Sequence, residues 1–131
     1  YDVTFDGEEI RTMMGIAPED AAEFMAENGA DVIALNCGSG IDVSWAARAV
    51  ERYRRITDLP TMAQPNAGLP ELVDMEVIYR QTPEEMTKEL SALLSAGANI
   101  VGGCCGSSPA HLRLFRKLLD ETQEGKREVE S

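Results

Sequence analysis

The residues with the clearest chemical potential are the chain's three cysteines, Cys37, Cys104 and Cys105. Cys104 and Cys105 are neighbours in the glycine-rich stretch 102–109, and Cys37 follows the strand-like run 32–36. Adjacent cysteines rarely bond to each other, because neighbouring residues reach disulfide geometry only with strain. Both can instead turn toward one soft metal ion. Three thiolates fill three positions of a zinc tetrahedron and leave the fourth open, so we expect Cys37, Cys104 and Cys105 to bind zinc.

The charge and spacing of this cysteine set indicate what the zinc would do. Zinc with three thiolates carries a formal charge of about -1, which makes it poor at generating hydroxide but suited to binding a substrate thiol as thiolate. The alternative is a structural zinc, which usually has four protein ligands at close spacing. Cys37 and Cys104 are 67 residues apart (104 minus 37), which favours an open functional site.

The two cysteine segments look like one repeated unit. Residues 29–38 and 97–106 each contain a helix-ending glycine, an apolar strand, a cysteine and another glycine. A helix opening at Pro18 precedes the first unit, and one opening at Pro83 precedes the second. Repeated units with ligands at the carboxyl ends of parallel strands are typical of (β/α)8 barrels. The pattern therefore predicts an α/β fold with parallel strands.

The remaining elements follow from periodicity and helix signals. We expect strands near 2–5, 32–36, 61–64 and 99–102, and helices over 18–28, 43–56, 83–96 and 109–120. A capping box at Thr82 and Glu85 opens the third helix. Residues 71–81 are expected to be irregular, and residues 121–131 to form a frayed polar tail.

Composition excludes several classes of function. Twelve lysines and arginines against 23 aspartates and glutamates give a formal charge of -11, which disfavours binding to nucleic acid or anionic membranes. No apolar run of about 18 residues is present, so no membrane span is expected. Three cysteines are an odd number, which fits a reducing compartment and predicts a cytoplasmic protein. Four arginines of the second helix are then expected to form a solvated outer face rather than a nucleic-acid patch: Arg48, Arg52, Arg54 and Arg55.

His111 is the chain's single histidine and lies in the first turn of the fourth helix, beside the double-cysteine stretch. It could serve as a zinc ligand. The three cysteines already suffice, so a supporting or capping role is favoured.

Several segments resemble a known family. They are Asn36-Cys37, Gln64-Pro65-Asn66-Ala67-Gly68-Leu69-Pro70, Thr82-Pro83-Glu84-Glu85-Met86, and Gly102-Gly103-Cys104-Cys105-Gly106 with Pro109 and His111. Together they resemble the homocysteine-binding domain of the zinc-dependent homocysteine S-methyltransferases. The match at 65–70 is closer to the module of cobalamin-dependent methionine synthase than to betaine–homocysteine methyltransferase.

The resemblance implies a fold. Residues 1–120 would be the C-terminal half, strands five to eight, of a (β/α)8 barrel, and 121–131 a polar tail. A closed barrel needs about eight strands, so we expect the missing N-terminal half or a second copy of the chain to complete it.

The resemblance also implies an activity. It is transfer of a methyl group to the thiol of homocysteine to give methionine, with Zn2+ as cofactor and homocysteine and a methyl donor as partners. Methylfolate through cobalamin, betaine and sulfonium donors all remain open. Asn66 and Gly103 are expected to bind substrate. Asn66 would be a weak fourth zinc ligand when substrate is absent, or else a turn asparagine bonded to its own backbone. Family members recognise the amino-acid part of homocysteine largely with the first half of the barrel, so the alternative is a non-catalytic zinc-binding fragment or assembly subunit.

Overall fold

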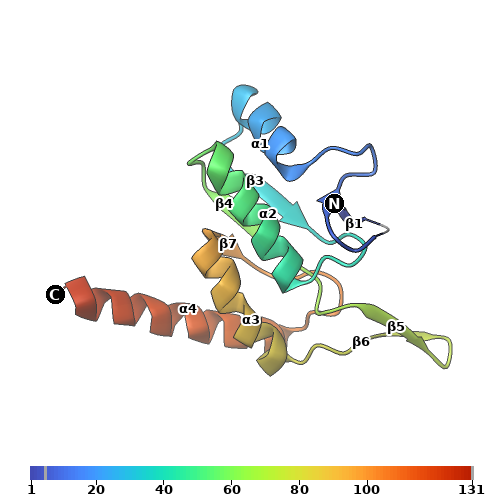
Figure 1. Ribbon diagram of the computed structural model, residues 1–131. Coiled ribbons are helices and arrows are strands. Elements are labelled where there is room, and N and C mark those ends of the chain that lie inside the picture. The colour runs from blue at the N-terminus through green and yellow to red at the C-terminus, as the bar shows by residue number, and fades with distance from the viewer. Residues whose placement is uncertain (5, 131) are drawn as a thin grey trace.

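The computed structural model describes residues 1–4 and 6–130, with side chains to residue 124 (Figure 1). Four helices lie within that part: α1 (Pro18–Glu27), α2 (Val43–Ile56), α3 (Pro83–Ala96) and α4 (Pro109–Glu130). The described strands are β1 (Asp2–Val3), β2 (Ile10–Arg11), β3 (Ile33–Asn36), β4 (Thr61–Gln64), β5 (Pro70–Val73), β6 (Glu76–Tyr79) and β7 (Ile100–Val101). None of the helices among the described residues combines the length and apolar character that crossing a membrane requires.

A parallel sheet forms the centre of the molecule. Its strand order in the described chain is β3-β4-β7. Ile33 to Asn36 lie beside Thr61 to Gln64, and Met62 and Ala63 lie beside Ile100 and Val101. Because the three strands run the same way, the loops that follow them meet at one edge of the sheet. The predicted α/β class and three of the four predicted parallel strands are confirmed.

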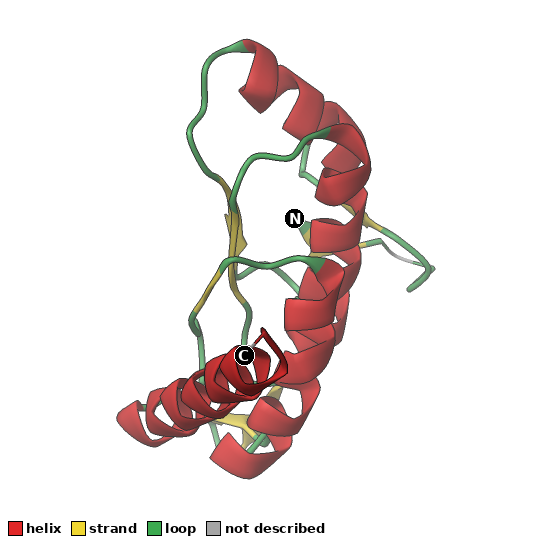
Figure 2. Cartoon of the chain, turned by 90° about the vertical axis from the view of Figure 1, so that its left-hand side faces the viewer, coloured by secondary structure: helices red, strands yellow, loops and turns green. Residues whose placement is uncertain are grey.

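The helices cover one face of this sheet (Figure 2). On that face Ile33, Leu35, Thr61 and Ala63 are buried. Side chains alternate between faces along a strand, so Ala34 and Asn36 point to the other side, where they are exposed. The layer arrangement is that of a βα repeat, and the sheet is open in the described chain. Its closure into a barrel stays a prediction.

Helix α2 is the centre of the core. Asp42 caps its N-terminus by accepting a hydrogen bond from the Trp45 N–H at 3.1 Å. Three alanines on its inner face let the sheet and α3 approach closely, and Tyr53 fills the far end. The predicted capping box of α3 is confirmed, because Thr82 and Glu85 exchange side-chain bonds with each other's backbone N–H.

The expected first parallel strand at 2–5 is wrong. Asp2–Val3 pairs antiparallel with Ile10–Arg11 instead of joining the sheet, and Phe5 lies outside the described residues. The physical reason is the turn that follows. Asp6 accepts hydrogen bonds from the Thr4 hydroxyl and the Glu8 N–H, and Gly7 takes a φ of 73°. The chain therefore folds back on itself at once.

The prediction that 71–81 is irregular is also wrong. Strands β5 and β6 pair antiparallel and project from the body as a hairpin (Figure 1). Asp74 and Met75 form its two-residue loop with φ of 48° and 65°, as the twist of a tight hairpin requires.

The last helix was predicted to end at Asp120, but it continues to Glu130. Residues 121–130 are rich in glutamate, glutamine, lysine and arginine, which favour helix even without an apolar face. The prediction for Ser131 lies outside the described residues.

Candidate metal centre

The structure brings the three cysteines together. Their Sγ atoms all lie within 4.8 Å of one another, and those of Cys37 and Cys105 are 3.5 Å apart. Zinc–sulfur bonds of about 2.3 Å in a tetrahedron would separate the sulfurs by about 3.8 Å. Three soft sulfur donors at this spacing fit zinc in both chemistry and distance.

Cys37 is placed by an unusual backbone turn at the end of β3. Its φ is 47°, which is uncommon for a residue with a side chain, and Gly38 follows at 103°. A side chain on Gly38 would overlap the Tyr1 carbonyl, so glycine is required there. A hydrogen bond from the Gly38 backbone, followed by those from Cys104 and Cys105, lowers the pKa of the Cys37 thiol. Cys37 is therefore favoured as the thiolate that a metal needs.

The double-cysteine loop after β7 is equally tight. The Ser107 N–H donates to the Cys104 carbonyl at 3.0 Å, and Gly106 has a φ of 81°. A Cβ on Gly106 would overlap the ring of Tyr79, and one on Gly103 would overlap Ser107. Burial, and then the Cys37 thiol, raise the pKa of Cys104. Gly103 thus shapes the loop that presents both sulfurs.

The loop after β4 joins these two cysteine loops. The buried Asn66 donates from Nδ2 to the Gly38 carbonyl at 3.1 Å, and its Oδ1 accepts from the Cys105 N–H at 3.2 Å. Two backbone hydrogen bonds also join the loop after β4 to the double-cysteine loop. Cys104 N–H donates to the Pro65 carbonyl, and Ala67 N–H donates to the Cys105 carbonyl. One amide side chain therefore helps to fix the separation of Cys37 and Cys105.

His111 bonds to two segments next to the double-cysteine loop. Its Nδ1 accepts from the Ser108 N–H at 3.1 Å, which places the proton on Nε2, and Nε2 then donates to the Gln81 carbonyl at 2.9 Å. Both ring nitrogens are engaged, and His111 is not in the group of possible metal ligands. Its supporting role toward a zinc site stays a prediction.

A hollow of about 330 Å³ opens beside the sulfurs. Besides the residues of the cysteine loops and Asn66, three residues from elsewhere line it: Asp2, Pro70 and Tyr79. Desolvation, and then the neighbouring Cys105, raise the pKa of Tyr79. The sequence analysis did not single out Asp2 or Tyr79. Asp2 lies in a strand that was expected to join the parallel sheet, and Tyr79 lies in a segment that was expected to be irregular. The hollow therefore gives access to the Cys37 and Cys105 side of the cysteine cluster.

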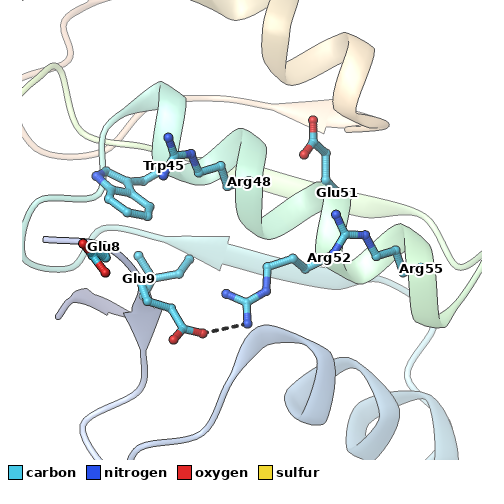
Figure 3. Close-up of a pocket in the computed structure, with 8 residues that line it drawn as sticks. Glu8, Glu9, Trp45, Arg48, Glu51, Arg52 and Arg55 are labelled. Carbon is cyan, nitrogen blue, oxygen red and sulfur yellow. Dashed lines mark hydrogen bonds and ion pairs between the residues drawn. The ribbon is translucent and has the colours of Figure 1, made fainter.

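A second hollow lies on the outer side of α2 (Figure 3). Arg48 stacks over Trp45 at 4.5 Å from the ring centroid. Arg52 pairs with Glu9 at 2.9 Å and also with Glu19. Arg52 therefore joins the 8–11 segment and α1 to α2, whereas Arg48 packs on a residue of its own helix.

Comparisons with known proteins identify the family of this chain. The model of the family described as homocysteine S-methyltransferase matches residues 1–119. A methionine synthase of Mycobacterium tuberculosis (strain ATCC 25618 / H37Rv) is 36% identical over 103 residues, covering 77% of this chain. A methionine synthase of Mycobacterium leprae (strain TN) is 38% identical over 99 residues, covering 74% of it. In each case the match covers 8% of the relative's own length. On the extent of these matches, the chain belongs to the homocysteine S-methyltransferase family.

Proposed function

We propose that this chain is the zinc-binding part of an enzyme that methylates the thiol of homocysteine to form methionine. The observation that carries the proposal is the group of three cysteine sulfurs, from two loops at the carboxyl edge of a parallel sheet, beside an open hollow that Cys37 and Cys105 line. A closed four-ligand site would leave no position for substrate, whereas three ligands beside a hollow leave one.

Each part of the site has a role in this proposal. Cys37, Cys104 and Cys105 would hold the zinc, and Asn66 would keep their loops at the right separation. When bound, the zinc would lower the pKa of the homocysteine thiol, ordinarily near 8.5, and keep its sulfur as a nucleophilic thiolate at neutral pH. Methylation leaves that sulfur neutral and a weaker ligand, which favours product release. The donor of the methyl group would approach through the hollow.

Asn66 and Gly103 are proposed to contact substrate. The carbonyl oxygen of Asn66 has a second lone pair beyond the one that Cys105 uses, so it remains chemically able to occupy the fourth position when homocysteine is absent. Gly103 is not among the residues that line the hollow, and its missing side chain makes room for Ser107, so a contact with substrate would come from its backbone. Its backbone lies beside Ser107, whose hydroxyl is buried.

We further propose that the open sheet is part of a (β/α)8 barrel, completed by an N-terminal half or a second copy. One face of the sheet is covered by helices and the other is uncovered. This supports the proposal, because the strands of such a barrel face helices on the outside and the barrel core on the inside. The second candidate function is a non-catalytic zinc-binding subunit. It is favoured by the presence of all three cysteine ligands on a chain whose sheet is open.

Metal analysis tests the shared premise. We expect chain prepared without chelator to contain close to one zinc, and Cys104→Ser to lose most of it. Ser91→Ala, an exposed change on α3, is the control and should retain zinc. Unchanged zinc in Cys104→Ser would contradict both functions. Methyl transfer to homocysteine by the chain joined with an N-terminal half of the family would separate the enzyme from the non-catalytic subunit.

A further inference from the structure

We propose that Asp2 binds the amino group of the thiol substrate, so that the hollow selects thiols carrying a nearby ammonium group. This inference rests on the proposed function and assigns one determinant of its substrate class. It places that determinant on the β1 segment, beside the cysteines.

The geometry places Asp2 at the site. Asp2 lines the same hollow as Cys37 and Cys105. It is fixed to the loop that follows Cys37, because its Oδ1 accepts a hydrogen bond from the Ser39 N–H at 2.7 Å. The next residue, Val3, donates its N–H to the Ser39 carbonyl at 2.9 Å. The carboxylate is therefore held in place before any ligand arrives.

The charges of the site favour a cationic group next to it. Among the described residues that line the hollow, Asp2 is the one carboxylate, and no lysine or arginine is present. A zinc with three cysteine thiolates and one substrate thiolate would carry a formal charge of about -2. An ammonium on the same substrate would meet that charge and the Asp2 carboxylate together, and hydrogen bonds between charged groups are the strong ones.

The Ser39 bond occupies one oxygen of a group that has two. An ionised carboxylate offers about four lone-pair sites, so Asp2 can hold the loop and still accept from an ammonium. Asp2→Asn is a sharp test for this reason. It removes the negative charge, while the amide oxygen can still accept from Ser39.

Cobalt(II) loaded in place of zinc reports thiol binding by its sulfur-to-cobalt absorption band. The chain is titrated with homocysteine and with 4-mercaptobutanoic acid, which lacks the amino group. We expect the wild-type chain to bind homocysteine more tightly. Asp2→Asn should weaken homocysteine binding by about tenfold to a hundredfold and leave 4-mercaptobutanoic acid unweakened.

Asp58→Asn is the matched control. It removes the same charge from an exposed residue just before β4, at the opposite end of that strand from the cysteines, and should change neither affinity. Equal binding of the two thiols by the wild-type chain, or equal weakening of both in Asp2→Asn, would overturn the role of Asp2 and leave the proposed function standing. Cobalt that binds without a new band for either thiol would overturn the proposed function, and the role of Asp2 with it.

Discussion

At the scale of single residues, Asn66 shows how one buried amide can set the spacing of metal-binding sulfurs. It bonds to the loops of both Cys37 and Cys105. Asn66→Ala removes both bonds and leaves the Cys105 N–H without its partner, so we expect zinc affinity to fall by about tenfold or more. Competition with a chromophoric chelator measures this. Asn28→Ala, an exposed change at the end of α1, should keep wild-type affinity, and equal affinity in the two variants would show that the Asn66 bonds are dispensable.

Gly106 tests the packing of the double-cysteine loop. Alanine there combines an unfavourable φ of 81° with overlap on the Tyr79 ring, so we expect a loss of unfolding free energy of about 2 kcal/mol or more, with weaker zinc binding. Gly7→Ala has a similar φ of 73° but open space around it, and isolates the backbone strain at about 1 kcal/mol. Denaturant unfolding compares the two. An equal loss of unfolding free energy in the two variants would mean that the Tyr79 contact does not hold the loop.

At the scale of elements, α1 is tied to α2 by a partly buried ion pair. The Arg52 guanidinium, by its hydrogen bond to Glu19, holds the pKa of that carboxyl below its usual 4.5. A lowered pKa means that the stabilisation is present at neutral pH and is lost as pH falls through the folded-state value. We expect Glu19→Gln to lower the unfolding free energy by about 0.5–1 kcal/mol at pH 7.

The same difference should shrink as pH falls through the lowered folded-state pKa of Glu19, because the carboxylate of the wild-type chain is then protonated as well. Unfolding curves across this range measure it. Glu23→Gln, an exposed change on the same helix, should have little effect at any pH. A Glu19→Gln deficit that persists undiminished in acid would show that packing, and not charge, joins the two helices.

Several of the helices and strands could be predicted from the sequence. Helices α1 to α3 and strands β3 and β4 follow from apolar periodicity, capping residues and terminal glycines, which are local signals. The cysteine cluster followed from the rule that parallel strands end at one edge. The β5–β6 hairpin was missed because its loop is Asp-Met rather than Asn-Gly or Asp-Gly. The positions of Asp2 and Asn66 at the site depend on contacts between distant segments. Asp2 bonds to Ser39, and Asn66 bonds to Gly38 and Cys105. No local pattern encodes those contacts.

At the scale of the whole molecule, the helices of the described residues cover one face of the sheet and leave its other face uncovered (Figure 2). Strands β3 and β7 form its edges in the described chain, and uncovered edges and apolar faces favour pairing. We expect the 14.3 kDa chain to associate at micromolar concentration, as light scattering would detect. Ala34→Glu, on the uncovered face, should favour the monomer, whereas Ala110→Glu, exposed on α4, should not. A cooperatively melting wild-type monomer would contradict the need for a partner.

The central claim is that three cysteine thiolates hold zinc with one position left for a substrate thiol. X-ray absorption at the zinc edge, recorded on the zinc-loaded chain with and without homocysteine, tests it most directly. The account predicts three sulfur ligands and one lighter oxygen or nitrogen ligand without homocysteine, and four sulfurs at about 2.3 Å with it. A sulfur count that homocysteine leaves unchanged, or fewer than three sulfurs at the outset, would contradict the account.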